Sequence, residues 1–171
     1  MQVSFPERTS SPPAEVARQL AGFFRYVTLA SDSDFFREVA ELDLSLSQLK
    51  ILSMLYEQPA PSAGEADYLS VKEVAERLGI SFPAASRALD PLVRRRLIAR
   101  REDTEDRRVK RVRLTVRGDA LVERLYASRV ASFEALLSSF TEIEREKLGA
   151  ALDEILTRSE ISRYCPRKVR R

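Results

Sequence analysis

The feature that most constrains the fold of this chain is a change of hydrophobic period near residue 97. Before it, apolar residues from Phe82 to Leu97 recur every three or four positions, and Ser81 stands where a helix N-cap is expected. After it, segments 97–101 and 109–114 are short and typical of strands, and only polar residues join them. The pattern predicts a helix followed by a β-hairpin with a charged tip.

Helix start and stop residues extend this order to both sides. The expected capping boxes are Ser45 with Gln48, Ser70 with Glu73, and Thr141 with Glu144. Gly79 is placed to end the second of these helices. Further helices are predicted over about 12–30, from Asp34, and over a long stretch after Thr115. The sequence therefore predicts a mainly α fold with a small β-wing, in which a winged helix-turn-helix core is flanked by helices at both ends of the chain.

Composition excludes several classes of function. The chain has 171 residues, no histidine and one cysteine, Cys165, so neither an intramolecular disulfide nor a multi-cysteine zinc site can form. Without histidine, a Gly-rich phosphate loop or a paired-carboxylate motif, we expect no enzyme, cofactor or metal. No apolar run approaches a membrane span and the N-terminus lacks a signal-peptide layout, so we expect a cytoplasmic protein with no membrane partner.

The net charge of +3 conceals a strong asymmetry. Between Arg87 and Arg117 there are 12 basic and 5 acidic residues, a net charge of +7. The stretch from Arg158 to Arg171 adds +5, whereas the rest of the chain carries −9. A compact basic stretch on an acidic body calls for an anionic partner.

Double-stranded DNA is the partner that this order of elements fits. A helix enters the major groove, and its N-terminal half meets the base edges. A hairpin beside it can place an arginine in the narrow minor groove, where the potential is most negative. The sequence therefore predicts DNA recognition through the helix after Ser81 and the basic hairpin.

Positions 44–118 contain four stretches with a recognisable pattern, LSLSQLKIL (44–52), LSVKEVAERLGIS (69–81), FPAASRALDPLVRRRLIARR (82–101) and DTEDRRVKRVRLTVRG (103–118). With these stretches the chain resembles the MarR family of bacterial transcription regulators. The most specific part is Asp103, Asp106, Arg107 and Arg108, followed by Leu114, Thr115 and Gly118. The resemblance implies a winged helix-turn-helix regulator that binds DNA as a homodimer.

The family pattern also implies roles for single residues. The expected DNA-binding residues are Ser81, Pro83, Ala84, Ser86, Arg87, Arg94, Arg107 and Arg108. Arg108 matches the wing-tip arginine of the minor groove, and Asp106 matches the aspartate that supports it by a salt bridge. Arg87 can bond a guanine bidentately, a contact that contributes about 1–3 kcal/mol of discrimination.

The chain departs from the family pattern at two positions. Pro91 lies inside the recognition helix, where it removes an N–H and crowds the carbonyl of Arg87. We expect either a kink or a helix that ends near Asp90. Arg96 replaces the glycine usual before the first wing strand, and a positive φ there would strain it.

The domain boundaries follow from these assignments. We predict an N-terminal arm and dimerisation helix over 1–43, the DNA-binding domain over 44–114, C-terminal dimerisation helices over 115–160 and a basic tail over 161–171. Apolar stripes on the end helices favour their pairing in a homodimer. In the family, small aromatic or anionic effectors bind between these helices and the DNA-binding lobe, and Tyr26 and Tyr56 are the candidate ligand contacts.

The function predicted from the sequence is a repressor that binds a pseudo-palindromic operator and is released by a small-molecule ligand. The alternative is a winged helix that docks an acidic protein surface or associates with DNA without sequence preference. A redox switch at Cys165 is the less favoured interpretation, because the oxidant-sensing members of the family use a cysteine near the N-terminus.

Overall fold

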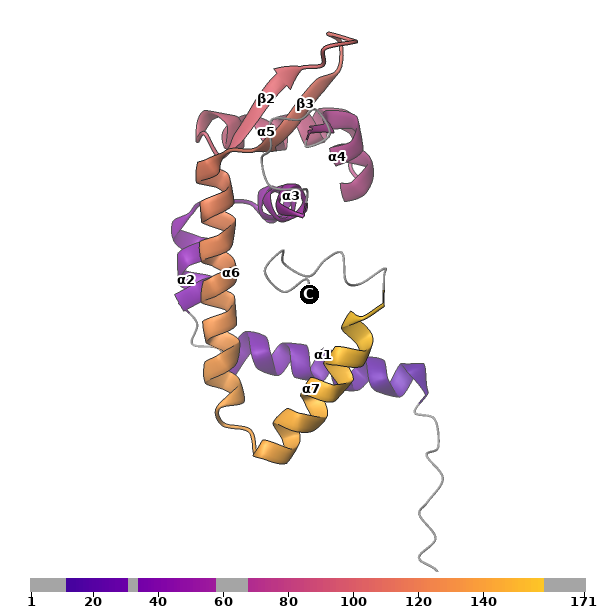
Figure 1. The fold of residues 1–171 in the computed structure, drawn as a ribbon, viewed down its shortest axis with the longest axis vertical. Helices are drawn as coiled ribbons and strands as arrows, with labels where there is room; N and C mark the ends of the chain where they lie inside the picture. Colours follow the sequence, from indigo (N-terminus) through magenta and orange to yellow (C-terminus); the bar gives the residue numbers. More distant parts are fainter. Residues whose placement is uncertain (1–11, 31–33, 58–67, 159–171) are drawn as a thin grey trace, which may run out of the picture.

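The computed structural model describes residues 12–30, 34–57 and 68–158 (Figure 1). Its helices are α1 (Pro13–Ala30), α2 (Asp34–Glu41), α3 (Leu46–Tyr56), α4 (Val71–Leu78), α5 (Phe82–Arg94), α6 (Val116–Leu137) and α7 (Glu142–Leu156). Its strands are β1 (Leu69–Ser70), β2 (Ile98–Glu102) and β3 (Lys110–Leu114). The predicted mainly helical fold with a small β-wing is confirmed.

The long helix α6 separates two regions of the molecule. At one end, α3, α4, α5 and the sheet form the winged helix-turn-helix lobe, whereas α1 and α7 lie toward the other end (Figure 1). Helix α2 packs along α6, and the Arg124 guanidinium on α6 pairs with the Glu38 carboxylate on α2. The winged helix-turn-helix lobe and the end helices thus lie toward opposite ends of α6.

The sheet contains the predicted hairpin and one strand that the sequence analysis missed. Strands β2 and β3 pair antiparallel, with Ile98 opposite Leu114 and Glu102 opposite Lys110. Strand β1 pairs with the outer edge of β3, where Leu69 lies opposite Val112, so the strand order is β1-β3-β2. Strand β1 has only two residues, and the second, Ser70, is also the N-cap of α4, so the strand is too short for its period to be recognised.

The helix caps form as the sequence predicts. All three capping boxes are present, and Thr115 caps α6 through a bond from the Gly118 N–H. The Ser70 backbone N–H donates to Glu73 over 2.7 Å, and this bond lowers the pKa of the Glu73 carboxyl. Gly79 ends α4 in the left-handed region, with φ 64°. The turn between α4 and α5 is therefore fixed at both ends by residues suited to it.

One hydrophobic core joins the lobe to the start of α6. Its most deeply buried side chains come from α3, α4, α5 and the sheet, and are Ile51, Leu52, Val71, Val74, Leu89, Leu92, Ile98 and Val112. Leu121, Val122 and Leu125 of α6 complete the cluster. Because α6 shares this core, its first turns are anchored to the lobe.

Helix α5 does not end at Asp90, so that alternative of the sequence analysis is wrong. The helix continues through Pro91 to Arg94. Leu89 and Leu92 flank the proline and are fully buried, so packing holds both sides of the interrupted turn. The Pro91 carbonyl accepts a bond from the Arg95 N–H over 3.0 Å, which closes the last turn. Proline removes one donor here, but its fixed φ is compatible with helix.

The turn between α5 and the wing is strained, and α6 packs closely onto it. Arg96 has φ 57°, the left-handed conformation that its usual glycine would adopt without cost. Its carbonyl accepts a bond from the Thr115 hydroxyl over 2.7 Å. At Gly118 an added Cβ would lie 2.0 Å from the Leu97 carbonyl oxygen. Only glycine allows α6 to approach this turn so closely.

Candidate nucleic-acid interface

Helix α5 presents one face to solvent and buries the other. Ala85, Leu89 and Leu92 are completely buried against the lobe. Among the residues predicted to read DNA, Ser81, Pro83, Arg87 and Arg94 are exposed, whereas Ala84 and Ser86 are half-buried. The Ser81 hydroxyl accepts the Ala84 N–H over 3.4 Å and begins the helix. The predicted set therefore lies on the accessible side of α5 or at its edge.

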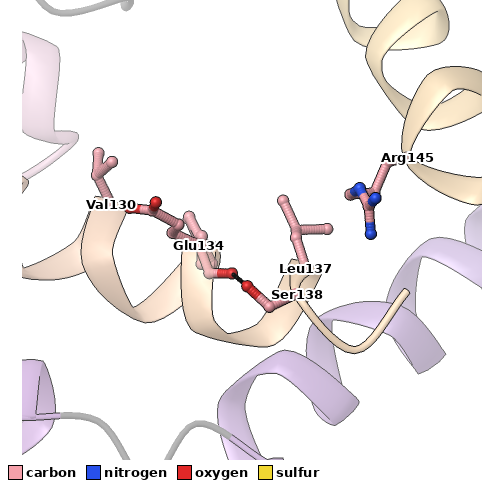
Figure 2. A pocket seen from close by; sticks show the side chains of 6 residues that line it. Val130, Glu134, Leu137, Ser138 and Arg145 are labelled. Carbon is pink, nitrogen blue, oxygen red and sulfur yellow. Dashed lines mark hydrogen bonds between the residues drawn. The ribbon is translucent and has the colours of Figure 1, made fainter. Parts of the chain in front are cut away.

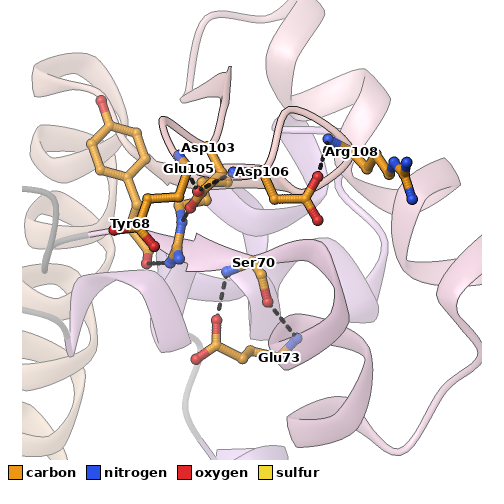
Figure 3. Close-up of polar contacts among 8 residues, drawn as sticks. Tyr68, Ser70, Glu73, Asp103, Glu105, Asp106 and Arg108 are labelled. Atoms are coloured by element: carbon orange, nitrogen blue, oxygen red, sulfur yellow. Dashed lines mark hydrogen bonds and ion pairs between the residues drawn. The ribbon is translucent and has the colours of Figure 1, made fainter.

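The tip of the wing is ordered by aspartates that accept backbone N–H groups. Asp103 accepts the N–H groups of Glu105 and Asp106 over 2.9 and 3.0 Å (Figure 3). The Asp106 carboxylate accepts the Arg108 N–H over 3.0 Å. Short side-chain acceptors of this kind stabilise tight turns. The hairpin tip thereby holds Arg107 and Arg108 outward, and both are exposed.

The predicted salt bridge between Asp106 and the Arg108 guanidinium does not form in this structure. Asp106 bonds the backbone of Arg108 instead, and the guanidinium extends away from it (Figure 3). A bond between a carboxylate and the N–H two residues later needs no ordered long side chain, so it forms readily within the turn. In this structure Asp106 shapes the turn of the wing tip and does not hold the charge of Arg108.

Asp103 also connects the tip to the strands, a role that the sequence analysis missed. Its carboxylate pairs with the Arg111 guanidinium, which also donates to the Tyr68 carbonyl over 3.4 Å. The Arg111 guanidinium and the N–H groups of Asp106 and Glu105 together lower the pKa of Asp103 to about 2. This carboxylate therefore stays ionised at neutral pH and fixes the wing loop to β3.

Two further wing arginines lie against one aromatic ring. The Arg101 guanidinium carbon is 3.7 Å and that of Arg113 is 4.7 Å from the centre of the buried Tyr68 ring. Arginine packs well on aromatic faces, where the ring quadrupole attracts it. Since strand residues 101 and 113 lie on the face opposite the core, this cluster stiffens the outside of the wing.

Three of the five acidic residues between Arg87 and Arg117 are paired with particular cations. Asp90 pairs with Arg100, Glu102 with Lys110 over 2.5 Å, and Asp103 with Arg111. Within the described ranges, four of the predicted DNA-binding arginines have no ion-pair partner. They are Arg87, Arg94, Arg107 and Arg108. Both α5 and the wing tip thus carry arginines whose charge no acidic side chain of the described residues neutralises.

The structure does not bring the two predicted ligand contacts together. Tyr56 is buried in the lobe core, and its hydroxyl donates to Glu123 on α6 over 3.4 Å. Tyr26 is 46% exposed on α1, toward the other end of α6 (Figure 1). Tyr56 therefore contributes to packing between α3 and α6, and Tyr26 alone is accessible.

An apolar groove lies between α6 and α7. It has a volume of about 660 Å³, and its lining residues are Val130, Phe133, Glu134, Leu137, Ser138 and Arg145. Leu137 of α6 and Arg145 of α7 face each other across it (Figure 2). The groove is remote from α5 and the wing, so it belongs to the end of the molecule that carries the predicted dimerisation helices.

Two negative findings concern only the described part of the chain. Across residues 12–30, 34–57 and 68–158, no group of three or more acidic or cysteine side chains is placed to hold a metal ion. No helix in these ranges has the length and apolarity needed to cross a membrane. Cys165 and the basic tail over 161–171 lie outside the described residues.

Comparison with known sequences identifies relatives of the lobe. Residues 42–109 match the sequence model of the MarR family. A 76-residue segment is 41% identical to the HTH-type transcriptional repressor MdtR of Bacillus subtilis. That match covers 44% of this chain and 49% of the relative, so the chain spans about half the length of MdtR.

Solved structures of MepR from Staphylococcus aureus, a transcription regulator, are similar over most of the chain. A point mutant of MepR bound to an oligodeoxyribonucleotide is 27% identical, with a TM-score of 0.59, over 83% of this chain and 96% of that one. MepR bound to ethidium bromide is 28% identical, with a TM-score of 0.57, over 80% and 94% of the two chains. Similarity to regulators thus extends beyond the lobe to the end helices.

Proposed function

We propose that this chain is a winged helix-turn-helix regulator of the MarR family, and that it acts as a sequence-specific DNA-binding repressor and a homodimer. The observation that carries this proposal is the set of exposed arginines without ion-pair partners, within the described residues, on α5 and the wing tip. Helix α5 reads the major groove through its first turns. Arg108 enters the minor groove, and Arg94 and Arg107 contact phosphates.

The homodimer is supported by apolar surface on the end helices. Many large apolar side chains there are at least one-third exposed, namely Val16, Leu20, Phe23, Phe24, Tyr26, Leu29, Val130, Phe133, Ile143, Leu152, Ile155 and Leu156. Exposed apolar area of this extent marks an association surface. We propose that segments 1–43 and 115–160 pair with those of a second copy, which presents two 44–114 domains to half-sites about one helical turn apart.

A ligand can release the protein from DNA only if it binds more tightly to a dimer whose two lobes are spaced wrongly for the two half-sites. We propose a small aromatic or anionic effector bound near the exposed Tyr26. The ethidium complex of MepR, a structural neighbour, supports an aromatic ligand of this kind. DNA as the partner also implies action in the cytoplasm.

The test is fluorescence anisotropy with DNA. A duplex selected by the protein from a random library is titrated at low and moderate salt, with random duplex as competitor. We expect tight binding that survives the competitor, two protomers per duplex, and a steep loss of affinity with salt because phosphate contacts release counterions. Binding abolished by random duplex would leave the nonspecific alternative, and no DNA binding would favour a protein-docking module.

The variant Arg108→Ala tests the wing assignment. Loss of the minor-groove contact is expected to weaken binding on the order of tenfold, the effect of one well-placed contact. The control Lys147→Ala removes one positive charge from α7, away from the interface, and should leave the affinity unchanged. Equal affinities of Arg108→Ala and the parent protein would contradict the wing assignment.

A further inference from the structure

Arg100 links the wing directly to the recognition helix. Its Nη1 atom lies 3.1 Å from Oδ1 of Asp90, and its Nη2 atom donates to the Ser86 hydroxyl oxygen in a long hydrogen bond of 3.5 Å. Asp90 and Ser86 belong to α5, whereas Arg100 belongs to β2. One side chain thus bridges the two elements that are proposed to contact different grooves of DNA.

The strand register explains why Arg100 reaches α5. Ile98 lies opposite Leu114 and Arg100 lies opposite Val112, and all three of these apolar partners are buried. Alternate residues of a strand share a face, so Arg100 follows Ile98 on the core side. Its side chain is only 27% exposed, which shields the ion pair from solvent on the strand side.

The two contacts on α5 lie four residues apart. Residues at this spacing are one turn apart on the same helix face. A planar guanidinium that engages both of them restricts rotation of α5 about its axis relative to β2. Lysine keeps the charge but lacks the rigid fork, so it cannot reproduce both contacts.

The charges of the Arg100–Asp90 pair indicate a role in positioning the wing rather than in raising the affinity for DNA. Asp90 is the acidic residue of α5, and its carboxylate would repel DNA phosphates if it were unpaired. Arg100 neutralises it, so the pair adds no net positive charge to the interface. Arg87, one residue after Ser86, has no such partner among the described residues and stays available to DNA.

We propose that Arg100 is a positioning residue that holds the wing at a fixed offset from the recognition helix. It thereby sets the distance along the duplex between the bases read by α5 and the minor groove entered by Arg108. This inference rests on the proposed DNA-binding function. It predicts a protein that is selective for spacing within each half-site, in addition to base sequence.

The experiment compares two duplexes. The first is the site that the parent protein selects from a random library. In the second, each half-site has one extra base pair between the bases that α5 is proposed to contact and the minor groove that the wing is proposed to enter. The parent protein should bind the second duplex about tenfold more weakly, a coupling of the size seen between contacting groups.

Two variants break the link with different effects on charge. Arg100→Lys conserves the charge, whereas Asp90→Ala raises the local charge by one. Both should reduce the insertion penalty to twofold or less, and Arg100→Lys should leave the salt dependence unchanged. A loss of the penalty in both variants cannot arise from charge, because they alter it differently.

The matched control is Glu102→Gln, which removes the wing ion pair with Lys110, while Glu102 forms no hydrogen bond or ion pair with α5 in the described structure. It should retain the full penalty, and thermal unfolding should confirm that all variants fold. If the parent protein discriminates the duplexes and both link variants discriminate them equally well, the positioning role is wrong. If the parent protein selects no duplex, the proposed function itself fails.

Discussion

The two ends of the molecule bury their apolar side chains very differently. In the winged helix-turn-helix lobe, Ile51, Val74, Leu89 and Val112 are fully buried within a single chain. In contrast, α7 has no buried residue, and Val27 is the buried residue of α1 among those described. Helix caps do not account for the contrast, because α4 in the lobe and α7 at the other end both begin with a capping box. The lobe thus completes its core within one copy, whereas the apolar side chains of the end helices stay exposed in one copy.

The strongest change is expected when charges are placed on the end helices, because only these helices are proposed to hold the dimer together. The double variant Leu20→Asp/Phe24→Asp places charges on the most apolar face of α1, where both side chains are about two-thirds exposed. Two-fold symmetry doubles the cost of burying each charge. We expect dissociation to monomers at micromolar concentration, measured by sedimentation velocity.

Leu46 provides the matched control, because it is 69% exposed but lies at the start of α3 in the lobe. Leu46→Asp should leave the sedimentation coefficient unchanged. If Leu46→Asp dissociates the protein and the α1 variant does not, the two ends have been assigned the wrong way round.

Gly118, which packs against the lobe, and Gly149 on α7 should respond oppositely to alanine. Gly118→Ala should destabilise the fold by about 3 kcal/mol, because its Cβ would overlap the Leu97 carbonyl oxygen. Gly149→Ala on α7 meets no atom within 4 Å and should stabilise the helix by about 0.5–1 kcal/mol. Urea unfolding at one fixed protein concentration measures both. Equal effects would mean that α6 does not pack against the turn as described.

A smaller gain in folding stability is expected at the strained backbone of the lobe. Arg96→Gly relieves a left-handed arginine and should stabilise the protein by about 1 kcal/mol. Asp43, with φ 47°, is the control, because aspartate tolerates this conformation and Asp43→Gly should gain less. Thermal unfolding of both variants gives the comparison, and a destabilised Arg96→Gly protein would show that the Arg96 side chain contributes more than its backbone costs.

The weakest change is expected in the pH dependence of folding stability, and it comes from Asp103 in the wing. The folded-state pKa of Asp103 is lowered to about 2 from its usual 3.8, so its ionised form stabilises the fold above pH 3.8. That contribution is lost as the pH falls through about 2. Asp103→Asn should therefore be less stable than the parent protein at pH 5, and the two should converge near pH 2. A difference in urea midpoint that is independent of pH would exclude the pair with Arg111 as its source.

Many local elements were predictable because each depends on a few neighbouring residues. Ser45, Ser70 and Thr141 cap helices as their spacing predicts, and Gly79 adopts the left-handed turn. The change of period near residue 97 and the two short segments after it predicted the wing. The departure from glycine at Arg96 drew attention to the backbone there, and the structure shows that its φ is positive.

Features that depend on side-chain choice between distant segments were not predictable. The sequence places Asp106 near Arg108, but only the folded turn shows that the carboxylate bonds the backbone. The link from Arg100 to Asp90 depends on how β2 packs on α5. Pro91 is tolerated in α5 because buried leucines flank it. The hydrophobic period of the sequence does not show whether this packing compensates for the hydrogen bond that proline removes. The homodimer and the residues that contact DNA stay predictions.

If a second copy of this chain covers the apolar face of the end helices, the purified protein is a dimer in solution. Light scattering during size-exclusion chromatography at micromolar concentration measures its mass. We expect about 39 kDa, twice the chain mass of 19.4 kDa. A mass of 19.4 kDa, for a protein that still binds its selected duplex, would contradict the dimer.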